Sequence, residues 1–251
     1  MTTLDQQRDA GRLFGYHETR AEWLFGFHHL GRDGHVARRD APRPQLRYFG
    51  VENETEYLDR HTRRRAVQEF TNSQRVWIAA EDGSLRCGAE FISAPATMAV
   101  WQRWATTLEF PSAARVERQT GLHVHVSRST LSRLTVAKLL RLSAAPDAQK
   151  ELTRLARRAP THYCRRLSRF LWAQGLWRAP TNHCSAINTA GAATVEFRLW
   201  KATLRAADSL TAIELADAMC TFAAIASAQH MTWREFIAWN VGAEKTEKSV
   251  F

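Results

Sequence analysis

The sequence contains few cysteines, and none of them lies in a pattern that binds metal or forms disulfides. Only four occur among 251 residues, far apart and without a CxxC pair. This spacing argues against both a cysteine zinc site and a disulfide framework. We therefore expect reduced thiols with mostly structural roles at Cys87, Cys164, Cys184 and Cys220.

The chain also lacks a long apolar run that is free of charges. The most apolar long stretch, Thr211 to Met231, contains Glu214 and Asp217, which indicates a buried helix rather than a membrane span. Residues 1–11 have no basic segment leading into an apolar one, so we expect no secretory signal. Together these features predict no membrane association and a cytoplasmic location.

Lysine is scarce although the chain is basic. Lysine accounts for five of the 35 basic residues, which face 25 acidic ones and give a formal charge of +10. Arginine in place of lysine is typical of a GC-rich genome, so the charge alone says little about partners. The arginines are dispersed and no known DNA-binding motif surrounds them. Solvated helix surfaces are therefore favoured, and nucleic acid is disfavoured as a partner.

The composition is that of a folded protein with an N-terminal extension. Hydrophobic residues make up 45% of the chain and include nine tryptophans, which excludes wholesale disorder. Residues 1–45 are irregular and end near Pro42 and Pro44, so we expect an extension there and one domain over 46–251. His28, His29 and His35 lack the repeated spacing of metal ligands, which favours a packed arm over a metal knuckle.

Alternating and helical patterns predict an α+β fold with a mostly antiparallel sheet and helices packed on one face. An Asp82-Gly83 turn with positive φ is expected between the second and third strands. Ser129 or Thr130 is expected to cap a helix that turns Leu134 inward. The predicted strands are 46–57, 75–80, 88–93, 122–127, 184–188 and 194–200, and the predicted helices are 61–70, 96–118, 131–142, 147–158, 162–174, 208–228 and 233–240.

Polar side chains occupy alternate positions on several predicted strands, where a core requires apolar ones. Residues two apart on a strand point to the same side of the sheet. Carboxylates suit Mg²⁺, imidazoles can complete a metal shell, and guanidinium groups bind phosphate oxygens, so this set is typical of a metal and phosphate site. The positions are Glu52 and Glu54, Glu90, His123 and His125, and Glu196 and Arg198.

Each of these patterns also has an ordinary structural interpretation. Glu52 and Glu54 suit the solvent face of an edge strand, and Glu196 with Arg198 suits a same-strand ion pair. His123 and His125 would be costly in a hydrophobic core. For these two residues the sequence favours a ligand role and a structural role equally. The functional interpretation depends on the joint occurrence of these residues.

Four motifs in this order resemble the amidoligase family found in phages, plasmids and bacteria. They are FGVENE (49–54), DGSL (82–85) leading to GAEFISAP (88–95), TGLHVHV (120–126) and EFRL (196–199). That family belongs to the carboxylate-amine ligase superfamily of glutamine synthetase and glutamate-cysteine ligase. The resemblance runs from about residue 47 to residue 231. It implies a glutamine-synthetase-like catalytic domain, although Asn53 stands where an apolar residue is more usual.

The resemblance implies an ATP-dependent ligase, in which ATP phosphorylates a carboxylate and an amine attacks the acyl phosphate to form an amide. The substrates would be carboxylates and amines of small molecules or peptides. The cofactors would be ATP and Mg²⁺, with Mn²⁺ as the alternative ion. His125 and Arg198 would contact the phosphates and act in catalysis, and Asp82 would orient or deprotonate the amine. The metal ligands would be Glu52, Glu54, Glu90, His123 and Glu196.

Two other functions remain open from the residues alone. A metal-dependent hydrolase would use His123, His125 and a carboxylate to hold Zn²⁺, although no HExxH or HxHxDH motif is present. A basic nucleic-acid-binding protein with a decayed site is the third possibility. No GxxxxGK[ST] phosphate loop occurs in the sequence, and the resembling family does not use one. The oligomeric state is left open.

Overall fold

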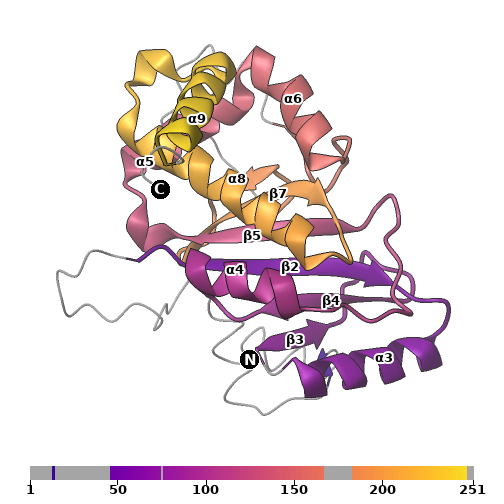
Figure 1. Cartoon of the computed structure of the whole chain (residues 1–251). Coiled ribbons are helices and arrows are strands. Elements are labelled where there is room, and N and C mark those ends of the chain that lie inside the picture. The colour runs from indigo at the N-terminus through magenta and orange to yellow at the C-terminus, as the bar shows by residue number, and fades with distance from the viewer. Residues whose placement is uncertain (1–12, 15–45, 75, 167–182, 248–251) are drawn as a thin grey trace.

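An antiparallel sheet forms the centre of the molecule (Figure 1). The computed structural model describes residues 13–14, 46–74, 76–166 and 183–247. Neighbouring strands of the sheet are all antiparallel, which confirms the predicted sheet. In spatial order the seven strands are β1 (Leu13–Phe14), β3 (Trp77–Ala80), β4 (Gly88–Ser93), β2 (Phe49–Glu56), β5 (Gly121–Ser127), β7 (Thr194–Lys201) and β6 (Ile187–Asn188).

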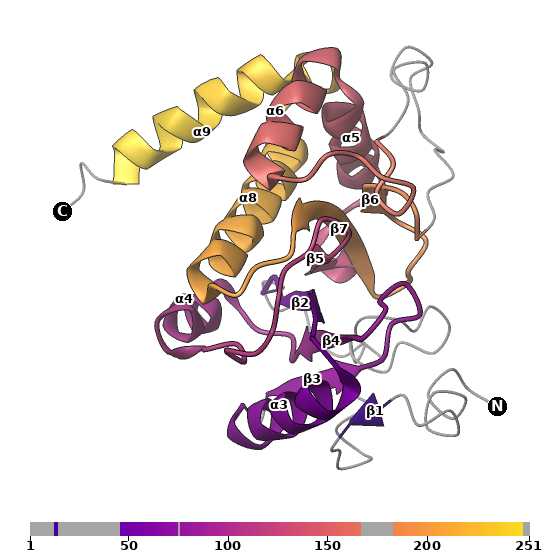
Figure 2. The same ribbon diagram turned by 90° about the vertical axis from the view of Figure 1, so that its right-hand side faces the viewer.

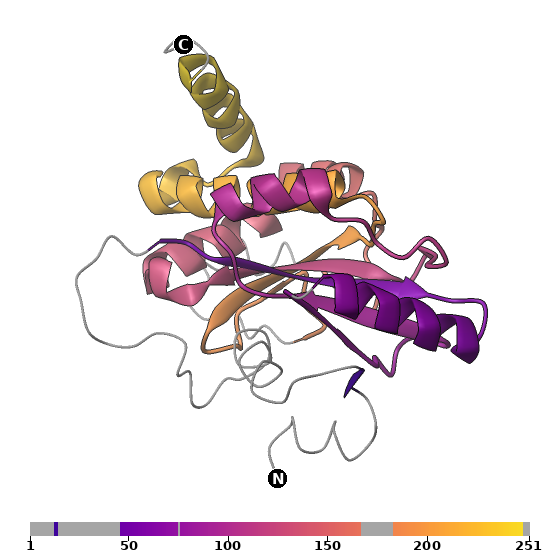
Figure 3. The ribbon, with the colours of Figure 1, turned by 60° about the horizontal axis from the view of Figure 1, so that its bottom comes forward.

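Helices α3, α4 and α8 lie together on one side of this sheet (Figure 3), as the predicted α+β fold requires. Helix α8 contacts β5 and packs against α4 and α5, whereas α9 leads away from the sheet (Figure 2). None of the helices in the described ranges combines the length and apolar character of a membrane span. The helices are α3 (Arg60–Ser73), α4 (Met98–Thr107), α5 (Arg133–Ala144), α6 (Pro146–Ala156), α8 (Ala206–Ile225) and α9 (Trp233–Glu247), with short 3-10 turns η1 (Arg128–Thr130) and η2 (Ala228–His230).

The central strand β2 is buried on both faces, with a different chemistry on each. Its alternate residues Phe49 and Val51 belong to the hydrophobic core beneath the helices. Glu52 and Glu54 point to the opposite face, because successive side chains of a strand alternate. All eight residues of β2 are nevertheless buried. The sheet therefore separates an apolar layer from a polar one.

Aromatic rings fill the apolar layer beneath α3 and α4. Phe70 on α3 contacts Phe91 on β4 with ring centroids 4.6 Å apart, and Trp77 meets Trp101 edge to face at 5.9 Å. The indole N–H of Trp101 donates to the Phe49 carbonyl at 3.0 Å. Such rings bury large apolar areas, so this cluster fixes α3 and α4 on the strands that carry Glu52 and Glu90.

Asn53 has a specific structural role on the helix-facing side of β2. Its side-chain amide donates to the Thr203 carbonyl at 2.7 Å, and its oxygen accepts from the Thr203 amide at 3.1 Å. Thr203 lies between β7 and α8, and its hydroxyl contacts Asp208 at 3.0 Å. The Thr203 backbone has no partner in a strand, and the Asn53 side chain supplies its hydrogen bonds. This pairing explains why a polar residue occupies a buried position on the helix side of β2.

Two predicted helix ends differ from the observed ones for clear local reasons. The helix predicted over 96–118 ends at Thr107, because Leu108 adopts an extended backbone and Pro111 cannot continue a helix. The cap of α5 is Ser132, not Ser129 or Thr130, since its hydroxyl accepts from the Thr135 amide at 3.0 Å. Leu134 is then 46% exposed rather than turned inward.

The connections also differ in part from the predictions. Strands β3 and β4 pair as expected, and residues 82–85 form a turn in which the Leu85 amide donates to the Asp82 carbonyl at 3.1 Å. The positive φ predicted at Gly83 is wrong. Of the helix predicted at 162–174, residues 162–166 form turns and a bridge instead, and residues 167–174 lie outside the described residues. Leu13 and Phe14 pair with β3 at the sheet edge. His28, His29 and His35 lie outside the described residues.

We predict that Asn53→Ala destabilises the protein by about 2–3 kcal/mol, because it removes two buried hydrogen bonds and leaves the Thr203 backbone unpaired. Urea denaturation followed by circular dichroism measures this change. Thr106→Ala is the control, since its hydroxyl bonds to the Arg103 carbonyl on an exposed helix face and should cost about 0.5 kcal/mol or less. Equal stability of Asn53→Ala and the parent would contradict the role assigned to Asn53.

Candidate metal centre

Four neighbouring strands bring acidic and imidazole side chains together on the face of the sheet away from the helices. The register places Glu54 opposite Glu90, Glu52 opposite His123 and His125 opposite Glu196. The side chains are buried, with residue exposures between 1% and 8%. We call this set the carboxylate-histidine cluster: Glu52, Glu54, Glu90, His123, His125 and Glu196.

Glu52 lies between the two histidines. Its Oε2 atom is 3.2 Å from His123 Nδ1, and its Oε1 atom is 3.1 Å from His125 Nε2. Both imidazoles share one face of β5, as their spacing of two residues predicted. A carboxylate between two imidazoles compensates positive charge in a buried site. The Glu52 carboxylate therefore connects both ends of the cluster.

Glu54 is held from the opposite side of His123. Its Oε2 atom accepts from the Gly121 amide at 2.6 Å, and Oε1 lies 3.3 Å from His123 Nε2. Burial raises the pKa of the Glu54 carboxyl and Asp82 adds to the rise, while His123 and Arg158 oppose it. Desolvation is the largest effect, because burial penalises the ionised form. A bound cation would favour ionised Glu54.

Glu90 is a buried carboxylate surrounded by other acidic groups. Burial, with the nearby charges of Glu52, Asp82 and Glu54, raises the pKa of its carboxyl well above the ordinary value. Like charges held together in a desolvated site cannot all ionise without a compensating cation. Asp82, half-buried in the loop between β3 and β4, approaches Glu54 and Glu90 closely enough to share an ion. Its carboxylate also accepts from the Ser84 amide at 2.7 Å.

His125 and Glu196 form the other end of the cluster. Burial lowers the pKa of His125, but Glu52 and Glu196 outweigh it, so the net shift is upward. His125 Nδ1 lies 3.1 Å from the Thr194 hydroxyl, which turns Nε2 toward Glu52. A contact of this kind on the far nitrogen orients a metal-binding histidine.

Glu196 is paired with Arg198 on the same strand. The Arg198 guanidinium donates to Glu196 Oε1, and Asn188 on β6 donates to Oε2 at 2.9 Å. Burial raises the pKa of Glu196, but the charges of His125 and Arg198 lower it by more. The pKa of this carboxyl therefore lies below its ordinary value. The same-strand ion pair is thus present. Arg198 also reaches the Tyr163 carbonyl at 3.3 Å, and its pKa is raised by Glu196 and Glu52 against the effect of burial.

A β-bulge in β7 lies opposite His123. Leu122 pairs with Trp200 and Val124 with Phe197, so Arg198 and Leu199 together oppose the single residue between them on β5. An extra residue reverses the alternation of the side chains that follow it. Arg198 therefore stays on the cluster face while Trp200 joins the hydrophobic core.

Three overlapping sets of side chains in the cluster are arranged to hold a cation. In each set one ligand atom per residue lies within 4.8 Å of the others. Two oxygens bound to one Mg²⁺ at about 2.1 Å are at most about 4.2 Å apart, so small side-chain movements suffice. Carboxylate oxygens dominate the sets, which suits Mg²⁺ or Mn²⁺. The sets are Glu52, Glu90 and His123; Glu52, His125 and Glu196; and Glu54, Asp82 and Glu90.

The structure brings all eight sequence-predicted site residues to this region, and it adds others that the sequence analysis missed. Thr194 continues the alternation of Glu196 and Arg198, so its position was foreseeable, and Asn188 lies in a predicted strand. Arg158, whose charge acts on Glu54, follows a helix and gave no such signal. Glu56 shares the face but accepts from the Arg86 and Cys87 amides, each at 2.9 Å, and so anchors the loop before β4.

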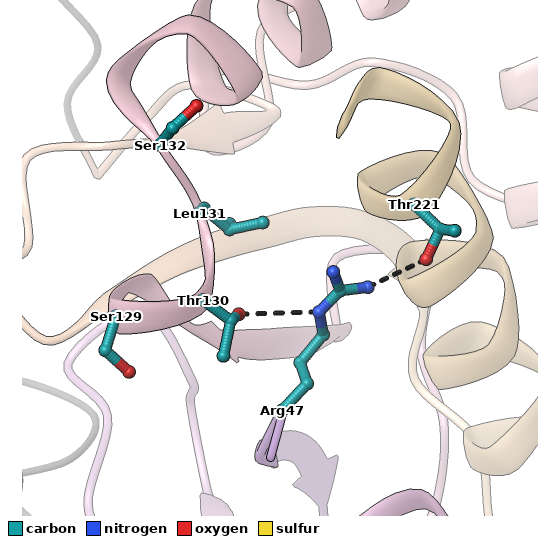
Figure 4. A pocket seen from close by; sticks show the side chains of 6 residues that line it. All are labelled: Arg47, Ser129, Thr130, Leu131, Ser132 and Thr221. Carbon is teal, nitrogen blue, oxygen red and sulfur yellow. Dashed lines mark hydrogen bonds between the residues drawn. The ribbon is translucent and has the colours of Figure 1, made fainter. Parts of the chain in front are cut away.

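A separate cavity of about 630 Å³ lies on the helix side (Figure 4). Arg47 in its wall donates to Thr130 at 3.4 Å and to Thr221 at 3.0 Å, and it forms an ion pair with Asp217. The remaining lining residues are Ser129, Leu131 and Ser132. No residue of the carboxylate-histidine cluster lines this cavity, and the charge of Arg47 is already compensated, so we assign it no chemical role.

We predict that Glu90→Gln stabilises the metal-free protein at pH 8. Since the pKa of Glu90 is raised from 4.5, the fold favours the protonated form, and stability is lost as pH rises above that value. The free energy of unfolding falls by about 1.4 kcal/mol per unit of pKa shift. Glutamine does not ionise, so the Glu90→Gln variant avoids this decrease. Thermal unfolding at pH 5 and pH 8 in EDTA, then with Mg²⁺ or Mn²⁺, measures both effects.

In the same experiment, Glu90→Gln should lose most of the stabilisation that a divalent cation gives the parent protein. Glu69→Gln on α3 is the matched control, because Glu69 is exposed and pairs with Arg65 on the same helix; it should behave like the parent. A Glu90→Gln protein less stable than the parent at pH 8 in EDTA would show that Glu90 is ionised and paired.

Comparisons with known proteins do not identify a family. No family model matches the chain, and no curated protein sequence matches it significantly. Function is therefore inferred from the chemistry of the cluster and from the motifs that place its residues on one face of the sheet.

Proposed function

We propose that this protein is an ATP-dependent carboxylate-amine ligase that forms an amide through an acyl phosphate. The observation that carries the proposal is the convergence of four glutamates and two histidines from four strands on one face of the sheet. The motifs that resemble the amidoligase family contain these same residues. The substrates are a carboxylate and an amine of a small molecule or peptide, and the proposed location is the cytoplasm.

The reaction requires charge compensation more than covalent participation by the protein. In the first step a carboxylate oxygen attacks the γ-phosphorus of ATP, the bond to the bridging oxygen breaks, and ADP leaves. In the second step the amine nitrogen attacks the acyl carbon, the bond to the phosphate oxygen breaks, and phosphate leaves. Both steps are favoured by groups that hold negative charge in place and align the reactants.

Each side chain has a role in this scheme. Glu52, Glu54, Glu90, His123 and Glu196 would hold Mg²⁺ or Mn²⁺, which when bound neutralises phosphate charge. His125 and Arg198 bind oxygens of the transferred phosphoryl group, and Arg198 is already oriented by Glu196. Asp82 accepts the proton that the amine loses. Asp82 lies near Glu54 and Glu90, at the end of the cluster away from His125.

A metal-dependent hydrolase is the second candidate. It is favoured by one observation, the set of His125, Glu52 and Glu196, which offers the two carboxylates and one imidazole of a three-ligand site. In that case the bound ion would be Zn²⁺ and would activate water. Tightly bound stoichiometric zinc in the purified protein, with no thermal stabilisation by ATP and Mg²⁺, would favour the hydrolase.

We predict ADP release that depends on Mg²⁺ or Mn²⁺ and on both an acid and an amine. A thermal-shift assay with ATP and Mg²⁺ comes first, followed by a coupled ADP assay over amino acids and dipeptides as acids and over ammonia and primary amines. With an acid labelled by ¹⁸O in its carboxylate, one ¹⁸O atom should appear in the released phosphate. Plain ATP hydrolysis leaves that phosphate unlabelled.

Glu52→Gln and Arg198→Ala should each lower kcat/KM about a thousandfold or more, because each removes charge compensation from the phosphoryl transfer. Arg198→Lys, which keeps the charge without the planar fork, should lose less. Glu69→Gln is the control and should retain the parent rate. Full activity in a folded Glu52→Ala/Glu196→Ala double variant would refute the site assignment.

A further inference from the structure

The chain after α6 brings a buried arginine to the edge of the cluster. Helix α6 ends with Arg157 in the left-handed conformation, at φ 51°, and the next residue, Arg158, is only 4% exposed. Its guanidinium donates to the Gln119 carbonyl at 2.9 Å and to the Trp200 carbonyl at 3.4 Å. These bonds fix the side chain at the ends of β5 and β7.

Gly121 makes room for this guanidinium. A Cβ atom at Gly121 would lie 2.2 Å from Arg158 Nη1 and 2.9 Å from His123 Nε2. The Arg158 guanidinium therefore occupies the space of the missing side chain, beside His123. Its charge also lowers the pKa of Glu54 against the effect of burial, which places it at the same end of the cluster.

A second arginine, Arg166, interacts electrostatically with Arg158. Arg165, the residue before Arg166, is fixed to the sheet edge. Its amide donates to the Cys184 carbonyl at 2.7 Å, and the Ala186 amide donates to its carbonyl at 2.8 Å. Burial lowers the pKa of Arg166. Cys164 opposes this decrease, and the positive charge of Arg158 adds to it. The two guanidinium groups thus lie within electrostatic range of each other and carry like charge.

Several nitrogens of this arginine pair are buried without an acceptor. In the part of the chain that the structure describes, Nε of Arg158 and Nε, Nη1 and Nη2 of Arg166 have no hydrogen-bond partner. Arginine stays protonated in proteins, so these donors remain charged. Buried charges without partners are costly, and two of like sign are more so. An anion between them would satisfy the donors and compensate the repulsion.

We propose that Arg158 and Arg166 form a binding site for an oxyanion, a phosphoryl or carboxylate group, at the Glu54 and His123 end of the cluster. The planar guanidinium fork matches both groups, because each presents two oxygens that accept parallel hydrogen bonds. Binding of this group requires neither a metal nor ATP turnover. The site lies beside the proposed ligase centre, so its natural occupant is an anionic group of a reactant.

The test measures anion binding in EDTA, without nucleotide or metal. Isothermal titration with inorganic phosphate and pyrophosphate, and separately with acetate and glutarate, is carried out on the full chain. The Arg166→Gln variant should bind the preferred anion at least tenfold more weakly than the parent. Arg165→Gln is the matched control, because Arg165 is exposed and bonds to His162; its affinity should stay within twofold of the parent.

A second readout separates an anion site from a structural arginine. In buffer free of oxyanions, Arg166→Gln should raise Tm, since it removes an uncompensated buried charge, whereas Arg165→Gln should leave Tm unchanged. Preference for phosphate and pyrophosphate identifies a phosphoryl site, and preference for acetate and glutarate a carboxylate site. Either preference supports the proposal.

Three results would overturn it: no oxyanion binding by the folded parent, equal affinity in Arg166→Gln and the parent, or an equal loss in Arg165→Gln. If the protein releases no ADP in the ligase assay but binds phosphate through Arg166, the proposed ligase function is refuted and the anion site stands.

Discussion

The carboxylate-histidine cluster depends on the pairing of Glu52 with both histidines of β5. Its two oxygens lie 3.2 Å and 3.1 Å from ring nitrogens of His123 and His125, and Glu52 belongs to two of the three sets of possible metal ligands. A buried carboxylate at this position is tolerated only when such partners are present. The adjacent Asn53 holds β2 to the segment before α8 on the other face, so the packing of the helix layer fixes the position of Glu52.

The molecule combines a positive overall charge with an acidic centre. The formal charge of +10 arises mostly from arginines, and exposed positions on α3 carry several of them. The cluster instead gathers four carboxylates, and Arg158 and Arg198 border it. A centre of this kind has separate places for a cation and for anionic groups. A metal-nucleotide complex or a metal-bound acid presents both charges at once, which agrees with the proposed chemistry.

The sequence predicted those features that depend on alternation along a strand. Glu52 and Glu54, His123 and His125, and Glu196 and Arg198 repeat at period two, so their common face follows from strand geometry, and the observed register unites them. Features that depend on the path of the chain in space were not predictable. Arg158, for example, reaches the cluster through a left-handed residue after α6. Helix ends were misplaced where a local interaction decided them, as at Ser132 and Leu108.

The bulge in β7 determines how much room the cluster has. With regular alternation, the residue after Arg198 on the cluster face would be Trp200, whose indole would project beside Gly121 and Arg158. The extra residue moves this indole to the opposite layer, where it lies 6.2 Å from the Phe197 ring. Pairing every residue of β7 in regular register, with none left out as a bulge, would therefore do more than shift its hydrogen bonds. It would turn a large aromatic ring toward the carboxylate-histidine cluster and so fill space on that face without altering any of the charged side chains.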